Sequence, residues 1–179
     1  MNGLTEIKKL SWSDVFDIWR QNEENSEHWQ KYWKAKGFES WEAWRNHTHA
    51  NLHGETLSWT LYKVEDPAKT VLQFLGGPFR SWTKWFYLNN THPSFTDIVQ
   101  HPGIQNHRAI LELIDSFPSP TTITGVKTSD GIVVIEGMHR TCALALSIVQ
   151  NRPITPKLYI ALADFPGELP LLGAEHKKN

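Results

Sequence analysis

The sequence predicts a protein of the α+β class, in which a small mixed sheet and its helices follow a helical, tryptophan-rich N-terminal region. Three observations favour this class. Aromatic residues recur at helical spacing in the first third, two β-branched runs joined by a tight turn lie in the last third, and one glycine separates the second run from an Ala/Leu-rich segment. At 179 residues, the chain fits one domain, or one domain with an appendage.

Three short amphipathic helices are expected in the first third. Ser13, Ser26 and Ser40 are suitable N-caps, because a serine hydroxyl accepts from the free N–H groups of a first helical turn. Seven of the nine tryptophans lie between Trp12 and Trp59, and within the expected helices Trp29 and Trp33 are four residues apart and Trp41 and Trp44 three. They are most simply core residues, whereas an exposed aromatic face would indicate a surface for a protein partner. We therefore assign residues 1–55 to a helical region packed on a domain formed by residues 56–179.

The middle of the chain is less regular. Residues 56–64 alternate weakly and predict a strand, whereas residues 67–75 fit either a short helix or a strand. Gly76, Gly77 and Pro78 break the chain before an aromatic and basic stretch at 79–88. Turn residues then surround a short apolar segment at 95–99.

The last third gives the clearest pattern. It predicts a helix closed by prolines, a β-hairpin, a helix that follows a glycine turn, and a final strand. The expected ranges are helix 105–117, strand 121–128, turn 129–131, strand 132–135, helix from about 139 to 149, and strand 157–162.

Composition narrows the class of protein. The formal net charge is −1 and no long basic run occurs, so nucleic acid is possible as a partner but not favoured. The single cysteine, Cys142, allows neither an intrachain disulfide nor a zinc cluster, and we expect it to be a small buried helix residue. No signal-peptide pattern opens the chain and no apolar run approaches the ~20 residues of a membrane span. We therefore expect a cytoplasmic protein without a membrane partner.

The turn between the second β-branched run and the following helix is the strongest functional feature. Such a strand-to-helix turn aims free backbone N–H groups at one point, and the helix dipole adds partial positive charge there. A histidine and an arginine in the first helical turn make this point suitable for phosphate. The residues concerned are Glu136, Gly137, Met138, His139, Arg140 and Thr141.

Each side chain of this turn has a functional and a structural interpretation. Arg140 could bind phosphate through its planar fork, or form an ion pair with Glu136. His139 could donate to phosphate or shuttle a proton, or fill a polar gap at the helix start. Glu136 could bind Mg²⁺ or act as a general base, or anchor Arg140. Thr141 could add a hydroxyl to the phosphate cradle, and Gly137 is required by the backbone in either case.

The order of elements, with Gly137-Met138-His139-Arg140 at the turn and a helix rich in small residues after it, resembles the ParB/sulfiredoxin superfamily. The resemblance covers residues 118–163 well and the helix at 105–117 loosely. It implies that this turn binds the phosphates of a nucleotide such as ATP, ADP or CTP, together with Mg²⁺. It also implies that His107 and Arg108, ahead of the helix, approach the nucleotide.

Two departures limit what the resemblance implies. Sulfiredoxins have their catalytic cysteine immediately before the His-Arg pair, where this chain has Met138, which is no nucleophile. Partition proteins carry a helix-turn-helix DNA-binding domain after this module, and only about thirty residues follow the helix here. We therefore expect neither a sulfiredoxin nor a full partition protein.

Other clusters offer weaker alternatives. His47, His49 and His53 could bind a metal, but no acidic partner accompanies them at motif spacing, so we expect no metal site there. Arg80 and Lys84 could form a second anion contact. The ring-rich run after them could stack a base or form a core segment, and it comprises Trp82, Trp85, Phe86 and Tyr87.

These observations lead to two function hypotheses. In the first, the chain is a nucleotide-dependent phosphotransferase acting on a small-molecule acceptor, or a nucleotide hydrolase, with Glu136, His139 and Arg140 as its catalytic residues. In the second, it is a non-catalytic module for which a nucleotide or nucleic acid is a regulatory ligand. Metal-dependent nuclease activity through Glu136 is a weaker third possibility.

Overall fold

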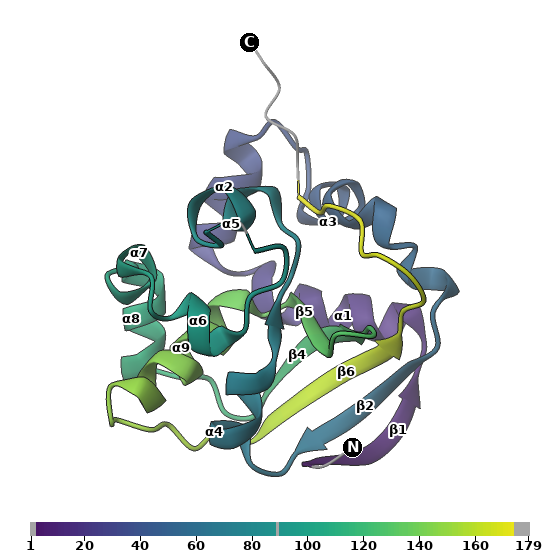
Figure 1. Ribbon diagram of the computed structural model, residues 1–179. Coiled ribbons are helices and arrows are strands. Elements are labelled where there is room, and N and C mark those ends of the chain that lie inside the picture. Colours follow the sequence, from purple (N-terminus) through teal and green to yellow (C-terminus); the bar gives the residue numbers. More distant parts are fainter. Residues whose placement is uncertain (1–2, 89, 174–179) are drawn as a thin grey trace.

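A computed structural model describes residues 3–88 and 90–173, and a six-stranded mixed sheet lies at its centre (Figure 1). The strand order is β1-β2-β6-β4-β5-β3. Neighbouring strands are parallel in the pairs β6/β4 and β5/β3 and antiparallel in the other three pairs. The strands are β1 Leu4–Leu10, β2 Trp59–Val64, β3 Leu75–Gly76, β4 Thr121–Lys127, β5 Ile132–Glu136 and β6 Leu158–Asp164. The chain is thus of mixed α and β structure, as predicted.

Helices α1, α2 and α3 occur in the first third, as predicted. The expectation that Ser13 caps the first of them is wrong, because Ser11 is its N-cap: its hydroxyl accepts from the Asp14 N–H, and the Asp14 carboxylate accepts from the Ser11 N–H. The helices of the chain are α1 Trp12–Glu23, α2 Glu27–Ala35, α3 Trp41–His49, α4 Pro67–Thr70, α5 Arg80–Trp85, α6 Phe95–Ile98, α7 Pro102–Gln105, α8 Arg108–Asp115 and α9 Met138–Val149.

Strand β1 corrects the expectation that the N-terminal region is helical throughout. It pairs with β2 as the outer strand of the sheet and is bulged between Glu6 and Lys8. Most of its residues are exposed on both faces, so its sequence lacks the alternation by which a half-buried strand is recognised. The predicted units 1–55 and 56–179 therefore share one sheet; residues 1–2, 89 and 174–179 of these units lie outside the described part of the chain.

Two apolar cores lie on opposite faces of the sheet (Figure 1). Leu158, Ile160 and Leu162 of β6 join a core with α6, α8 and α9, whereas Ala161 and Ala163 join a second core with α1 and α3. This alternation follows from the two-residue period of a strand. The N-terminal tryptophans of α1 and α3 thus cover the sheet face that α9 leaves open.

The predicted order of the last third is confirmed: α8, the β4–β5 hairpin, the glycine turn, α9 and β6 follow one another. Helix α8 begins at Arg108 and not at Gln105, because residues 102–105 form the separate short helix α7. The open alternatives at 67–75 resolve into the short helix α4 and, after a 3₁₀ turn, the two-residue strand β3.

The pairing of β3 with β5 brings the ring-rich stretch to the glycine turn. These strands are parallel, with Gly76 opposite Val134. The segments that follow the two strands therefore leave the sheet at the same edge. Beyond that edge, β3 leads into α5 and β5 leads into Gly137 and α9. Two segments far apart in the sequence therefore border one space, next to the N-terminal helices. Within the described residues, no helix has the length and apolar character needed to cross a membrane.

Candidate functional site

A cavity of about 560 Å³ lies at this edge of the sheet. Its walls come from the end of α1, from α2, α3 and α5, and from the turn at 136–140, so the predicted N-terminal region and the predicted phosphate turn face the same space. A volume of this order is typical of a small-molecule site. Of the predicted site residues, Glu136, Gly137, Met138, His139 and Arg140 line it.

Gly137 shapes the start of α9. Its φ is +97°, and a Cβ at this position would lie 2.5 Å from Ile123 Cγ2. A glycine is therefore required both by the backbone conformation and by the close packing. Thr141 donates its hydroxyl to the Gly137 carbonyl oxygen at 3.0 Å, which places this hydroxyl inside the helix and away from the cavity.

The first amides of α9 are available to a ligand. Thr141 N–H bonds back to the Gly137 carbonyl oxygen, but no described residue accepts from the backbone N–H groups of Met138, His139 or Arg140. The positive end of the helix dipole adds to the attraction of these donors for an anion. The turn thus has the donors that the sequence predicted.

The imidazole of His139 packs among aromatic rings. Its ring centre lies 5.4 Å from that of Trp82, 5.9 Å from Trp29 and 5.1 Å from His107. Within the described chain, neither ring nitrogen makes a hydrogen bond. Burial lowers the pKa of His139 to about 3, and nearby His107, His28 and Arg140 add to this effect. The imidazole is therefore neutral at pH 7, with one donor and one acceptor to offer.

Arg140 and Glu136 form a buried ion pair. One end of the guanidinium bonds to the Glu136 carboxylate, while Nη1 donates to Thr121 Oγ1 at 2.6 Å and to the Thr122 carbonyl oxygen at 3.0 Å. Burial raises the pKa of Glu136 above its usual value, although Arg140 opposes this. These contacts agree with the structural interpretation of the pair, in which Glu136 anchors Arg140.

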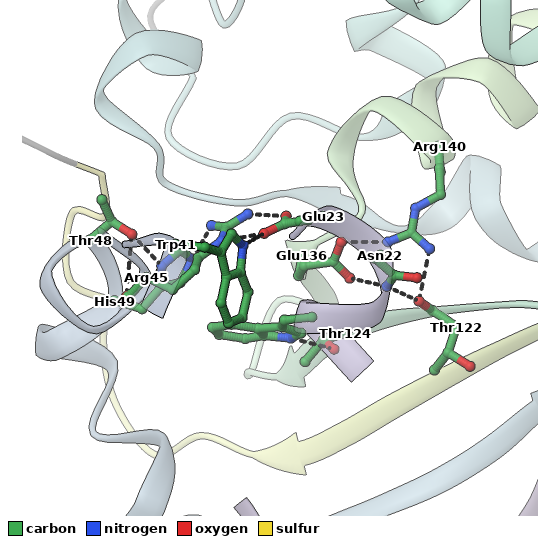
Figure 2. Close-up of polar contacts among 11 residues, drawn as sticks. Asn22, Glu23, Trp41, Arg45, Thr48, His49, Thr122, Thr124, Glu136 and Arg140 are labelled. Carbon is green, nitrogen blue, oxygen red and sulfur yellow. Dashed lines mark hydrogen bonds and ion pairs between the residues drawn. The ribbon is translucent and has the colours of Figure 1, made fainter. Parts of the chain in front are cut away.

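A second buried ion pair, which the sequence analysis missed, lies beside the first (Figure 2). Arg45 of α3 donates to Glu23 of α1, with its Nε 2.6 Å from Oε2, and Trp41 Nε1 donates to the same oxygen at 3.0 Å. Asn22 connects the two pairs along α1, because its amide donates to Glu136 Oε2 at 3.3 Å. Glu23 and Glu136 thus lie between the two arginines, and no local motif marks residues that are so far apart in the chain.

The opposite walls add rings and positive charge. Lys36, Arg80 and Lys84 line the cavity together with Arg45 and Arg140, whereas only two carboxylates of the described chain do so. These two carboxylates are paired with the two buried arginines, and the other walls of the cavity bring three further cationic side chains to it. The aromatic lining consists of Trp29, Tyr32, Trp44, Phe79, Trp82 and Trp85.

The two second-rank predicted residues behave differently. His107 reaches the site indirectly, since its ring contacts that of His139 and its buried Nδ1 makes no hydrogen bond within the described chain. Arg108 is exposed, pairs with Glu112 at 2.7 Å and does not line the cavity. The resemblance thus placed one of the two residues close to the turn.

The histidines of α3 and its end do not converge. His49 is buried against Trp19 and lies 2.9 Å from Thr48 Oγ1, whereas His47 and His53 are exposed. In the described part of the chain, no three His, Cys, Asp or Glu side chains are arranged to hold a metal ion.

The turn does not offer Mg²⁺ a protein ligand. Magnesium prefers oxygen ligands, usually carboxylates and phosphates. The two oxygens of Glu136 are bonded to Arg140 and to Asn22. The residues present therefore do not fit a protein-held magnesium ion, and any Mg²⁺ would have to arrive on the phosphates of a ligand.

Comparisons of the chain with protein-family models, with curated proteins and with solved structures gave no match. The resemblance to the ParB/sulfiredoxin superfamily therefore stays a prediction, which rests on the turn and on the order of elements around it.

Glu23→Gln is expected to destabilise the protein by roughly 3–5 kcal/mol, because it leaves Arg45 as a buried charge without its counter-ion. The measurement is the free energy of unfolding in urea at pH 7. Glu27→Gln is the matched control, since Glu27 pairs with Lys31 at 2.6 Å on the exposed surface, and its effect should stay within experimental scatter. Equal effects of the two substitutions would contradict a stabilising role for the buried pair.

Acidification from pH 6.5 to pH 5 is expected to lower the free energy of unfolding. Burial lowers the pKa of both His49 and His139, so both stay neutral in the folded state. Unfolded imidazoles titrate near pH 6.5, so the unfolded state binds more protons below that pH. Each histidine then contributes a slope that approaches about 1.4 kcal/mol per pH unit.

Urea titrations across this pH range measure the slope. His49→Gln and His139→Gln should each make it shallower, and comparison with the unmodified protein cancels the contribution of other groups such as Glu136. His47→Gln, at an exposed position of the same helix as His49, should leave the slope unchanged. If neither His49→Gln nor His139→Gln changes the slope, the pH dependence does not come from these two buried histidines.

Proposed function

We propose that this chain is a nucleotide-binding protein whose cavity receives the phosphates at the start of α9. One observation carries the proposal: unpaired amides and an unpaired imidazole face a cavity whose other walls supply rings and cations. Phosphate oxygens need donors and positive charge, and a nucleobase needs an apolar planar surface. This cavity offers both.

The phosphate end would rest on the backbone amides of residues 138–140 and on the ring N–H of His139. Neutral His139 suits this role because one of its ring nitrogens carries an N–H donor, and the second proton that would charge the buried ring is not needed. Arg80 and Lys84 approach from α5 and would add charge from the opposite wall. Arg140 contributes by holding the turn through Glu136 and the backbone of β4.

His139→Ala is expected to weaken nucleotide binding by about 10-fold or more, because a hydrogen bond to a charged oxygen is worth roughly 1.5–3 kcal/mol. Isothermal titration calorimetry with ATP, ADP and CTP, with and without Mg²⁺, measures the change. His47→Ala removes an exposed imidazole outside the cavity and serves as the control. If none of these nucleotides binds the unmodified protein, or if His139→Ala binds them as tightly, the proposal fails.

Phosphoryl transfer is a second candidate function, favoured by the state of Glu136. Burial raises the pKa of this carboxyl, and a carboxyl shifted toward neutral pH exchanges protons more readily with a hydroxyl. In such a reaction, the acceptor oxygen would attack the terminal phosphorus, the nucleoside diphosphate would leave, and Glu136 would take the acceptor proton. Arg140, bonded to Glu136, would stabilise charge on the transferred group.

Nucleotide loss in the presence of Mg²⁺ separates the two functions. If the chain is an enzyme, purified protein consumes nucleotide in the presence of water or of a hydroxyl acceptor, and Glu136→Gln lowers the rate by roughly 10²-fold or more. This variant keeps the shape of the side chain but leaves the buried Arg140 without its counter-ion, so circular dichroism must first show that it is folded. Saturable binding without turnover, with and without Mg²⁺, would leave the non-catalytic module as the function.

A further inference from the structure

We propose that the mouth of the cavity holds the planar ring of its ligand between Tyr32 and Trp85, so that the site selects aromatic anions over inorganic polyphosphates. The inference rests on the proposed nucleotide binding and assigns the ring to a definite place. Tyr32 belongs to α2 and Trp85 to α5, and both line the cavity. Residues of both helices line the same cavity, and α2 and α5 lie in the upper part of the view in Figure 1.

These two rings are unusual in their exposure. Trp85 is 61% exposed and Tyr32 is 39% exposed, whereas Trp19, Trp41 and Trp59 are almost completely buried. A large apolar ring in water gains free energy when another apolar surface covers it. Two such rings on different walls of one cavity can both be covered by a single flat group.

A lysine ammonium group also lies beside each ring. Lys36 Nζ lies 5.7 Å from the ring centre of Tyr32, and Lys84 Nζ lies 4.7 Å from that of Trp85. Both lysines line the cavity. A ring beside an ammonium group favours a ligand that is aromatic and negatively charged, since the ring stacks and the ammonium attracts the charge.

Two tryptophan rings support the position of the Tyr32 ring. Its ring makes edge contacts with Trp29 at 5.8 Å and with Trp44 at 5.7 Å. Trp29 in turn contacts His139, so an aromatic chain runs from the mouth to the phosphate turn. The ring subsite and the phosphate subsite are therefore ends of one continuous lining, as a nucleotide requires.

Stacking tolerates every base, because each has a flat π-face. We therefore expect the subsite to define a class of ligand, the aromatic anion, and not a single base. Two ring contacts, of 5.8 Å from Tyr32 to Trp29 and of 5.9 Å from Trp29 to His139, separate the ring subsite from the turn, which favours a nucleotide over a compact aromatic acid.

The test compares a nucleotide with tripolyphosphate, which has the charge but no ring. Tyr32→Ala and Trp85→Ala should each weaken ATP binding by roughly 10-fold or more, since stacking on one side chain has an effect of this size. The affinity of tripolyphosphate, measured by displacement of ATP, should change less than 3-fold. Tyr32→Phe and Trp85→Phe keep a ring and should bind ATP nearly as the unmodified protein does.

Leu88→Ala is the matched surface control, because Leu88 is 79% exposed, lies close to Trp85 in sequence and does not line the cavity. Circular dichroism verifies that each variant is folded. ATP should also quench part of the tryptophan fluorescence, and the quenching should be smaller in Trp85→Phe.

The outcomes separate this inference from the function on which it rests. If ATP binds and both alanine variants retain its affinity within 3-fold, the ring subsite is refuted while nucleotide binding stands. The ring subsite is refuted as well if the alanine variants lose ATP and tripolyphosphate equally. If ATP does not bind the unmodified protein, the proposed function itself fails.

Discussion

The candidate site depends on four buried charged residues, two from the N-terminal helices and two from the glycine turn. Glu23 and Arg45 come from α1 and α3, and Glu136 and Arg140 come from the end of β5 and the start of α9. A buried charge without a partner costs several kcal/mol, so each member is stable only while its partners are in place. Because Asn22 links the two pairs, the glycine turn and the N-terminal helices are fixed relative to each other.

This arrangement changes the role of the arginine in the turn. A guanidinium that bonds to a carboxylate, a hydroxyl and a carbonyl oxygen is a structural anchor first. The donors left for a ligand are the amides of residues 138–140 and the imidazole of His139, and these carry little net charge. Under the proposed function, the turn would position the phosphates through these donors, while Lys84 lines the cavity from α5 and would add positive charge.

Local signals explain which parts were predictable from the sequence. The hairpin, Gly137 and α9 follow one another in the chain, and their turn and helix patterns can be recognised within a few residues. Strand β1 has no such pattern, because an exposed edge strand does not alternate. The contact between Asn22 and Glu136 spans 114 positions, and nothing in the neighbourhood of either residue identifies the other.

The tryptophans also show that local sequence patterns do not predict which residues form the site. Their spacing predicted helices correctly, but spacing alone does not distinguish Trp19 and Trp41, which fill the core, from Trp29, which forms a wall of the cavity. The difference arises because α1 and α3 lie on the sheet, while α2 has no fully buried residue and extends beyond the sheet edge beside the turn. The ring-bearing wall is therefore built by the region that the family resemblance does not cover. If phosphates rest on the turn, the rings that α2 and α5 bring to the other walls of the cavity would select among phosphate ligands.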